Sequence, residues 1–116
     1  MTTKEELIAQ NNKLKRLDFF TNQTINAESI AFDYKQGLAL KIIVLGNLDG
    51  AKVCYKISFD SGATYQDYCV DNEIITQDVV NKDIEINIQE NIKIKCVLTG
   101  VNSNTNITVK GFYQSF

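Results

Sequence analysis

The chain has 116 residues, of which 44% are hydrophobic and 22% charged, and its net charge at pH 7 is −2. This length and composition predict one globular domain with a single core, and they exclude a disordered tail. Histidine is absent, which excludes Ser-His-Asp and Cys-His nucleophile activation and His-ligated zinc. The acidic balance argues against duplex nucleic acid as a partner. We therefore expect a protein without enzymatic activity, cofactor or metal.

The sequence shows neither a secretory signal nor the ~20 consecutive apolar residues of a membrane span. We expect a protein made in the cytoplasm, with no membrane partner. Its three cysteines are Cys54, Cys69 and Cys96, and no two of them have Cys-x-x-Cys spacing. Reduced structural thiols are the expected state.

The first 17 residues differ from the rest of the chain. Thr3 and Glu6 have the spacing of a capping box, and the residues that follow contain neither Gly nor Pro. This pattern predicts a helix over about residues 3–16. We accordingly divide the chain into an N-terminal helical arm, 1–17, and a β domain, 18–116.

A thin apolar stripe runs along this predicted helix, at Leu7, Leu14 and Leu17. A helix of about 13 residues is marginal in water, so it needs a packing partner. The stripe fits two interpretations: the helix packs on its own domain, or it docks as an arm on another subunit. Leu7, Leu14 and Leu17 are thus candidate subunit contacts.

From Asp18 onward, apolar residues recur with a period of two, and Gly, Asn and Asp separate the alternating segments. About seven or eight short strands with close turns predict an all-β fold, an antiparallel β-sandwich of jelly-roll or immunoglobulin-like type. The N-terminal α-helix would precede it. The alternating segments include residues 29–34, 38–45, 84–88, 92–98 and 107–109.

The segment 38–45 is apolar on both faces. Leu40, Ile42 and Val44 share one face, and Ile43 and Leu45 point to the other. A covered second face explains this pattern, with either the N-terminal helix or another subunit as the cover. Ile43 and Leu45 are therefore candidate subunit contacts.

The run from Ser58 to Tyr65 resembles an Asp-box, a hairpin motif of sialidase propellers and other β proteins. By this resemblance, Asp60 accepts backbone N–H bonds within the turn, Gly62 adopts positive φ, and Tyr65 fills the core. In such families the motif is structural and lies away from the catalytic centre. A single copy predicts one hairpin and no propeller.

A hairpin centred between Ser61 and Gly62 has a predictable register. It places Val53 opposite Val70, Cys54 opposite Cys69, Tyr55 opposite Tyr68 and Lys56 opposite Asp67. Opposed cysteines can approach disulfide distance. The two alternatives are a Cys54–Cys69 bridge and two packed thiols.

Acidic residues cluster after this turn, at Asp60, Asp67, Asp71 and Glu73. Their spacing is not that of an EF-hand, and nothing selects two of them as the carboxylate pair of a glycosidase. We predict neither a metal site nor a catalytic site here.

The overall layout resembles small bacteriophage virion proteins. The residues that carry this resemblance are the hairpin Tyr55-Lys-Ile-Ser-Phe-Asp-Ser-Gly62, the stretch Thr24-Ile-Asn-Ala27 and the terminal run 106–113. It implies a non-enzymatic structural subunit of a homo-oligomer that contacts other virion proteins. A head decoration protein or head-fibre base is the first expectation, and a neck or tail component the next.

A carbohydrate- or protein-binding β-sandwich module is the alternative function. Exposed aromatic residues would form its binding platform, and Phe112 and Tyr113 are the candidates.

Overall fold

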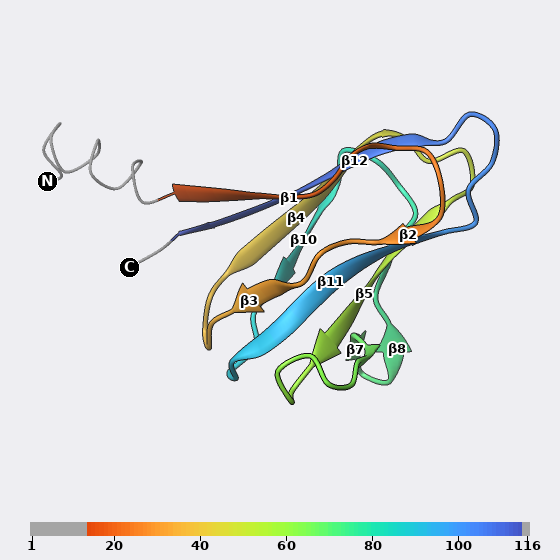
Figure 1. The fold of residues 1–116 in the computed structure, drawn as a ribbon. Helices are drawn as coiled ribbons and strands as arrows, with labels where there is room; N and C mark the ends of the chain where they lie inside the picture. The colour runs from red at the N-terminus through yellow and green to blue at the C-terminus, as the bar shows by residue number, and fades with distance from the viewer. Residues whose placement is uncertain (1–13, 115–116) are drawn as a thin grey trace, which may run out of the picture.

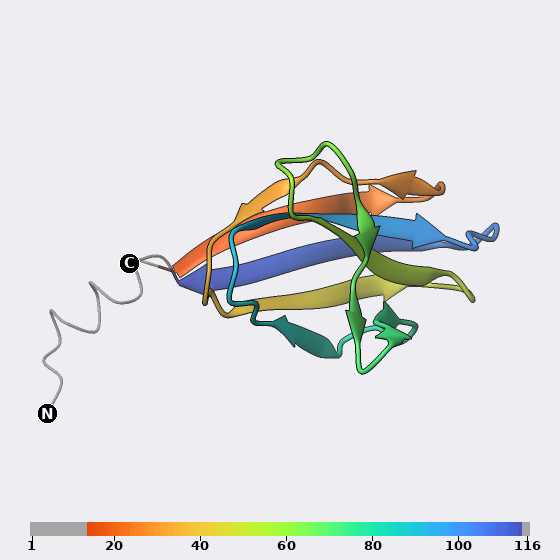
Figure 2. The ribbon, with the colours of Figure 1, turned by 90° about the horizontal axis from the view of Figure 1, so that it is seen from below.

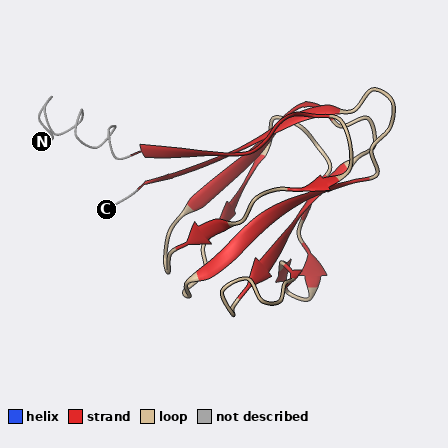
Figure 3. Ribbon diagram, in the orientation of Figure 1, coloured by secondary structure: helices blue, strands red, loops and turns tan. Residues whose placement is uncertain are grey.

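The computed structural model describes residues 14–114, which form an all-β, antiparallel fold without a helix (Figures 1 and 3). Residues 3–13 of the predicted helix lie outside the described part. The helix prediction is wrong for residues 14–16, because strand β1 (Leu14–Gln23) begins there. The predicted domain boundary after residue 17 falls inside this strand.

A four-stranded sheet forms one layer of the molecule. Its order is β1, β12, β4 and β10, so β1 and β10 are its edges. The three further strands of this sheet are β12 (Asn106–Gln114), β4 (Leu40–Asn47) and β10 (Asp83–Ile86).

A six-stranded sheet forms the second layer. Its two long central strands are β11 (Ile92–Thr99) and β5 (Lys52–Ser58). Two short strands, β2 and β3, pair with β11 on one side, and two others, β6 and β9, pair with β5 on the other. The bounds of the short strands are β2 Ala27–Glu28, β3 Phe32–Tyr34, β6 Gln66–Asp67 and β9 Thr76–Gln77.

The strand pairs follow a nested order along the chain. The first strand, β1, pairs with the last, β12, and β2 and β3 pair with β11. Further in, β4 pairs with β10, and β5 pairs with β6 and β9. Successive pairs in this nested order belong alternately to the four-stranded and the six-stranded sheet, and the two sheets face each other as layers (Figure 2).

A single hydrophobic core lies between the two sheets, because every second residue of the long strands points inward. The ring of Phe19 meets the ring of Tyr55 edge-on across the core, with centroids 6.2 Å apart. The largest fully buried side chains include Tyr34, Tyr55, Leu40, Ile42, Ile86, Ile94, Leu98 and Ile107.

A bulge in β1 changes which residues face the core. Asp18 pairs with Lys110 and Phe20 pairs with Val109, so Phe19 is an extra residue on β1. As a result Phe19 and Phe20 are both buried although they are neighbours in sequence. This long-range pairing with β12 explains why the segment from Leu14 is a strand.

The predicted hairpin register is correct only next to the turn. Lys56 pairs with Asp67, as predicted, and the N–H of Tyr68 donates to the carbonyl of Tyr55 at 2.9 Å. Beyond Tyr68 the chain leaves β5 and forms a separate small hairpin, β7 (Cys69–Val70) with β8 (Glu73–Ile74).

This small hairpin rules out the predicted opposition of Cys54 and Cys69. Cys69 pairs with Ile74, and Cys54 lies opposite Thr76 of β9. All three cysteines are free. The physical reason is a second two-residue turn, in which Asp71 and Asn72 both have positive φ, the conformation of a tight type I′ hairpin.

Candidate functional site

The outward side of the four-stranded sheet carries the apolar residues that sequence analysis singled out. Ile43 lies between Lys110 of β12 and Asp83 of β10, and Leu45 lies opposite Thr108. Ile43 and Leu45 are half-buried, while Leu40, Ile42 and Val44 face the core. We call this side the outer face and define it by Lys41, Ile43, Leu45, Asp83, Glu85, Thr108, Lys110 and Phe112.

Phe112 extends the apolar part of the outer face. It lies opposite Lys41 of β4 and opposite Arg16 of β1, and it is half-buried. We call the three half-buried residues Ile43, Leu45 and Phe112 the apolar centre of the outer face. Charged residues of both signs lie beside them, because Lys110 and Asp83 lie opposite Ile43 and Lys41 lies opposite Phe112. Apolar residues beside charges of both signs suit a protein contact, because they offer apolar area for burial together with charge pairs.

Leu14 and Leu17, which the predicted helical stripe grouped with Leu7, point to opposite sides of strand β1. Leu17 is half-buried and packs against the core, and Leu14 is 56% exposed near the start of β1. Leu7 lies outside the described residues. Leu17 therefore packs partly against the core of its own domain, and Leu14 is the more exposed leucine of β1.

The Asp-box-like turn after β5 has the predicted hydrogen bond from a backbone N–H to Asp60, and two hydroxyl groups add further bonds. The Thr64 N–H donates to Asp60 Oδ1 at 2.9 Å, and the Thr64 hydroxyl donates to Oδ2. The Ser58 hydroxyl donates to Asp60 Oδ1 at 2.7 Å and accepts the Gly62 N–H at 2.9 Å. The φ of Gly62 is +92°, as predicted, and that of Ser61 is +60°.

These donors stabilise the ionised form of Asp60. The hydroxyl of Thr64, its N–H and the Ser58 hydroxyl together lower the pKa of the Asp60 carboxyl to about 2. Because the folded-state pKa is below the ordinary value, the turn gains stability that is fully present above about pH 4. That stability is lost as the pH falls through about 2.

We predict that Thr64→Val raises the pKa of Asp60 toward its ordinary value, because valine has no hydroxyl donor. Titration of the Asp60 carboxyl by NMR measures this shift. The loss of stability below about pH 4 that Asp60 causes should then be smaller in the variant than in the wild type, because the folded and unfolded pKa values lie closer together. An unchanged Asp60 titration would show that the turn hydrogen bonds do not set this pKa.

Tyr65 does not fill the core, so this part of the Asp-box expectation is wrong. It is half-buried, and Lys95 Nζ lies 4.0 Å from its ring centroid. Lys95 Nζ also lies 2.6 Å from Glu28 Oε1. The ring therefore covers the outward side of the six-stranded sheet, because Ile57 of β5 already points into the core at that end.

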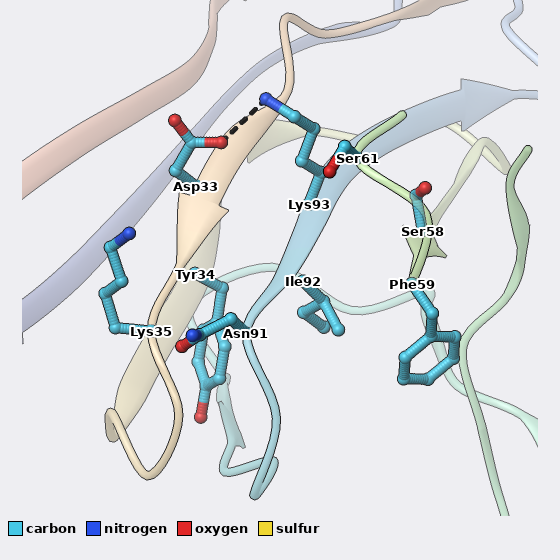
Figure 4. Close-up of a pocket in the computed structure, with 9 residues that line it drawn as sticks. All are labelled: Asp33, Tyr34, Lys35, Ser58, Phe59, Ser61, Asn91, Ile92 and Lys93. Atoms are coloured by element: carbon cyan, nitrogen blue, oxygen red, sulfur yellow. Dashed lines mark hydrogen bonds and ion pairs between the residues drawn. The ribbon is translucent and has the colours of Figure 1, made fainter. Parts of the chain in front are cut away.

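A shallow cavity of about 180 Å³ lies beside the same turn (Figure 4). Phe59 stands on one side, Lys35 and Asn91 on the other, and Ile92 lies between them. Phe59 is 52% exposed. An exposed aromatic ring next to polar groups can stack on a sugar ring while hydroxyls bind nearby.

An ion pair forms one border of this cavity, where Lys93 Nζ lies 2.7 Å from Asp33 Oδ1. The hydrogen bond from Lys93 lowers the pKa of Asp33, and the same bond raises the pKa of Lys93. Both groups therefore stay charged at neutral pH. Phe59 was not predicted as a site residue from the sequence, although it is the one large apolar residue in the turn run Ser58-Phe-Asp-Ser-Gly62.

The acidic and cysteine side chains of the described residues do not form a metal site. Within residues 14–114 no three His, Cys, Asp or Glu side chains are placed to hold a metal ion. The acidic residues after the turn are thus not gathered into a ligand set. Burial raises the pKa of the Cys96 thiol above its ordinary value, so this thiol is unreactive near neutral pH.

No helix in the described part of the chain is long and apolar enough to cross a membrane.

Comparison with known proteins finds no matching family model, curated protein or solved structure. Function must therefore be inferred from the outer face, the turn and the strand order.

Proposed function

We propose that this protein is a non-enzymatic structural subunit of a homo-oligomeric assembly, of the type found among bacteriophage virion proteins. A head decoration protein or head-fibre base is the first choice, and a neck or tail component the second. The outer face carries this proposal, because Ile43, Leu45 and Phe112 are half-exposed there on regular strands. After synthesis in the cytoplasm, the protein would reside in the virion.

The strand order supports a jelly-roll topology, which we propose over the immunoglobulin-like alternative. If β2 and β3 count as one strand and β6 and β9 as another, the two large sheets together have eight strands, and the β7–β8 hairpin is an insertion. The first of these eight strands pairs with the last, and the pairing continues inward in the same order. This nested pairing across two sheets is the jelly-roll arrangement, which occurs in viral capsid proteins and in lectins.

The energetics of the outer face favour burial in a contact between subunits. Complete burial of the exposed parts of Ile43, Leu45 and Phe112 is worth about 3 kcal/mol at ordinary transfer values. That is a useful share of an interface once the entropy of association is met. The lysines and acids around the apolar centre can form charge pairs that fix orientation.

We predict that the double substitution Ile43→Thr, Leu45→Thr weakens the oligomer at least tenfold. Threonine keeps strand propensity, so the domain should still fold. Sedimentation velocity measures the assembly, and denaturant unfolding measures the stability of the monomer. The matched control is Val70→Thr, Ile74→Thr, which changes two exposed apolar residues on the β7–β8 hairpin. The control should leave the oligomer unchanged.

A different outcome would contradict the proposal. If the double variant forms the same oligomer as the wild type, with the same dissociation constant, but loses unfolding free energy, the chain's own residues cover the outer face. The assembly proposal would then lose its main support.

Carbohydrate binding is the second candidate function, and the exposed ring of Phe59 beside the cavity favours it. The aromatic residues named from the sequence are less suited: Phe112 lies on the outer face, and Tyr113 packs against Phe32 with ring centroids 5.2 Å apart. A glycan array followed by NMR titration tests this function. Phe59→Ala should abolish any sugar-dependent shifts, whereas Val79→Ala, another exposed apolar site, should preserve them. A wild-type protein that binds no glycan would exclude this candidate.

A further inference from the structure

Strand β1 is a long, open edge of the four-stranded sheet. It pairs with β12 on one side, and on its other side no strand of residues 14–114 pairs with it. Leu14 to Asp18 form an unbroken ladder with β12, ahead of the bulge at Phe19. In Figures 1 and 2, this part of β1 and the end of β12 extend together away from the rest of the molecule. An accessible edge of this kind is a template for pairing with another strand.

The charges on β1 are arranged for pairing with a second copy of itself. Arg16 and Asp18 lie on the same side of the strand, and Leu17 points to the other side. The Arg16 and Asp18 side chains are 59% and 44% exposed, and Arg16 Nε lies 3.6 Å from Asp18 Oδ1. One strand thus presents a cation and an anion, separated by one residue, on its accessible outward side.

We propose that β1 pairs antiparallel with β1 of a second copy of this chain, about a two-fold axis at Leu17. This inference rests on the proposed function, because it names the partner in the homo-oligomer. A two-fold axis perpendicular to the sheet keeps the outward sides of both copies on the same side. Directly opposed residues must then point to the same side, and neighbouring residues of a strand do not. The axis therefore lies at a residue and not between two residues. An axis at Arg16 would oppose two arginines, and an axis at Asp18 would oppose two aspartates. Only the axis at Leu17 pairs Arg16 of each copy with Asp18 of the other.

This pairing would also explain how the outer face is used. Two four-stranded sheets joined at β1 form one continuous sheet, with both outer faces on the same side. The apolar centres around Ile43 of the two copies would then lie on one extended surface. Edge pairing would thus build the dimer, and the extended surface would be available for further contacts.

Charge reversal in the full chain tests the pairing. We expect Arg16→Asp and Asp18→Arg each to raise the dimer dissociation constant roughly tenfold or more, because each places like charges directly opposite one another. The combined variant R16D/D18R should restore dimerisation. An equimolar mixture of the two single variants should also dimerise, because a strand with two carboxylates then faces a strand with two guanidinium groups. Lys52→Asp is the control, because it makes the same charge change as Arg16→Asp at an exposed residue of the other sheet, the first residue of β5.

The mixture of single variants distinguishes contacts between copies from the Arg16–Asp18 contact within one strand. In the mixture, each strand carries two like charges, so the contact within the strand is absent and only the contacts between copies can restore dimerisation. If the wild type oligomerises and the single variants do not weaken it, or if neither the double variant nor the mixture restores it, the edge pairing is wrong. The proposed function would survive that result. A monomeric wild type would overturn the proposed function and the edge pairing together.

Discussion

Gly46→Ala should lower the free energy of unfolding by about 3 kcal/mol, because the added methyl group meets backbone rather than a movable side chain. Gly46 lies in β4 at φ +100°, and a Cβ there would be 2.3 Å from the carbonyl oxygen of Asn106. Since Gly46 pairs with Ile107 of β12, relief of the overlap requires the two strands to separate. Denaturant unfolding followed by circular dichroism measures the loss.

Gly37→Ala is the matched control for this prediction. Gly37 also has positive φ, +76°, but a Cβ there would meet only Gln89 Oε1 at 3.7 Å. The expected loss is about 1 kcal/mol, from backbone strain alone. If both variants lost the same stability, close packing of β4 on β12 at Gly46 would not be the cause.

Gln77→Leu should lower the free energy of unfolding by about 2–3 kcal/mol, because Gln77 connects the two sheets through the core. Its side chain is 5% exposed and accepts the hydroxyl hydrogen bond of Tyr55. Its Nε2 donates to the carbonyl of Ile42 at 3.2 Å and to that of Lys82 at 3.4 Å. Leucine would leave the buried hydroxyl and carbonyl groups without these partners. Thermal or denaturant unfolding measures the effect.

A double-mutant cycle with Tyr55→Phe checks the cause of that loss. Phenylalanine removes the buried hydroxyl, so the Tyr55→Phe, Gln77→Leu protein should lose less stability than the sum of the single losses. Additive losses would indicate that the two residues act independently, and that the Tyr55–Gln77 hydrogen bond contributes little.

The period-two pattern predicted the β fold and the inner faces of its long strands. Leu40, Ile42 and Val44 are buried as expected, because alternation along a strand is a local property. The same alternation placed Ile43 and Leu45 on the outer face. The turn at Gly62 was also predictable, since Asp, Gly and Thr at that spacing form local hydrogen bonds.

The errors arose where distant residues decide the structure. Leu14 and Leu17 fit a sparse helical stripe, and pairing with β12 places them in a strand instead. The Cys54 register failed because a second turn at Asp71 diverts the chain. Burial of Gln77 could not be foreseen either, since its hydrogen-bond partners lie on Tyr55 and Ile42.

The mass of the wild-type chain in solution tests the central claim of assembly most directly. Light scattering coupled to size exclusion, over a range of micromolar concentrations, measures it. We expect a species heavier than the 13.1 kDa monomer, and its fraction should rise with concentration. A mass of 13.1 kDa at every concentration would contradict assembly through the outer face and the β1 edge.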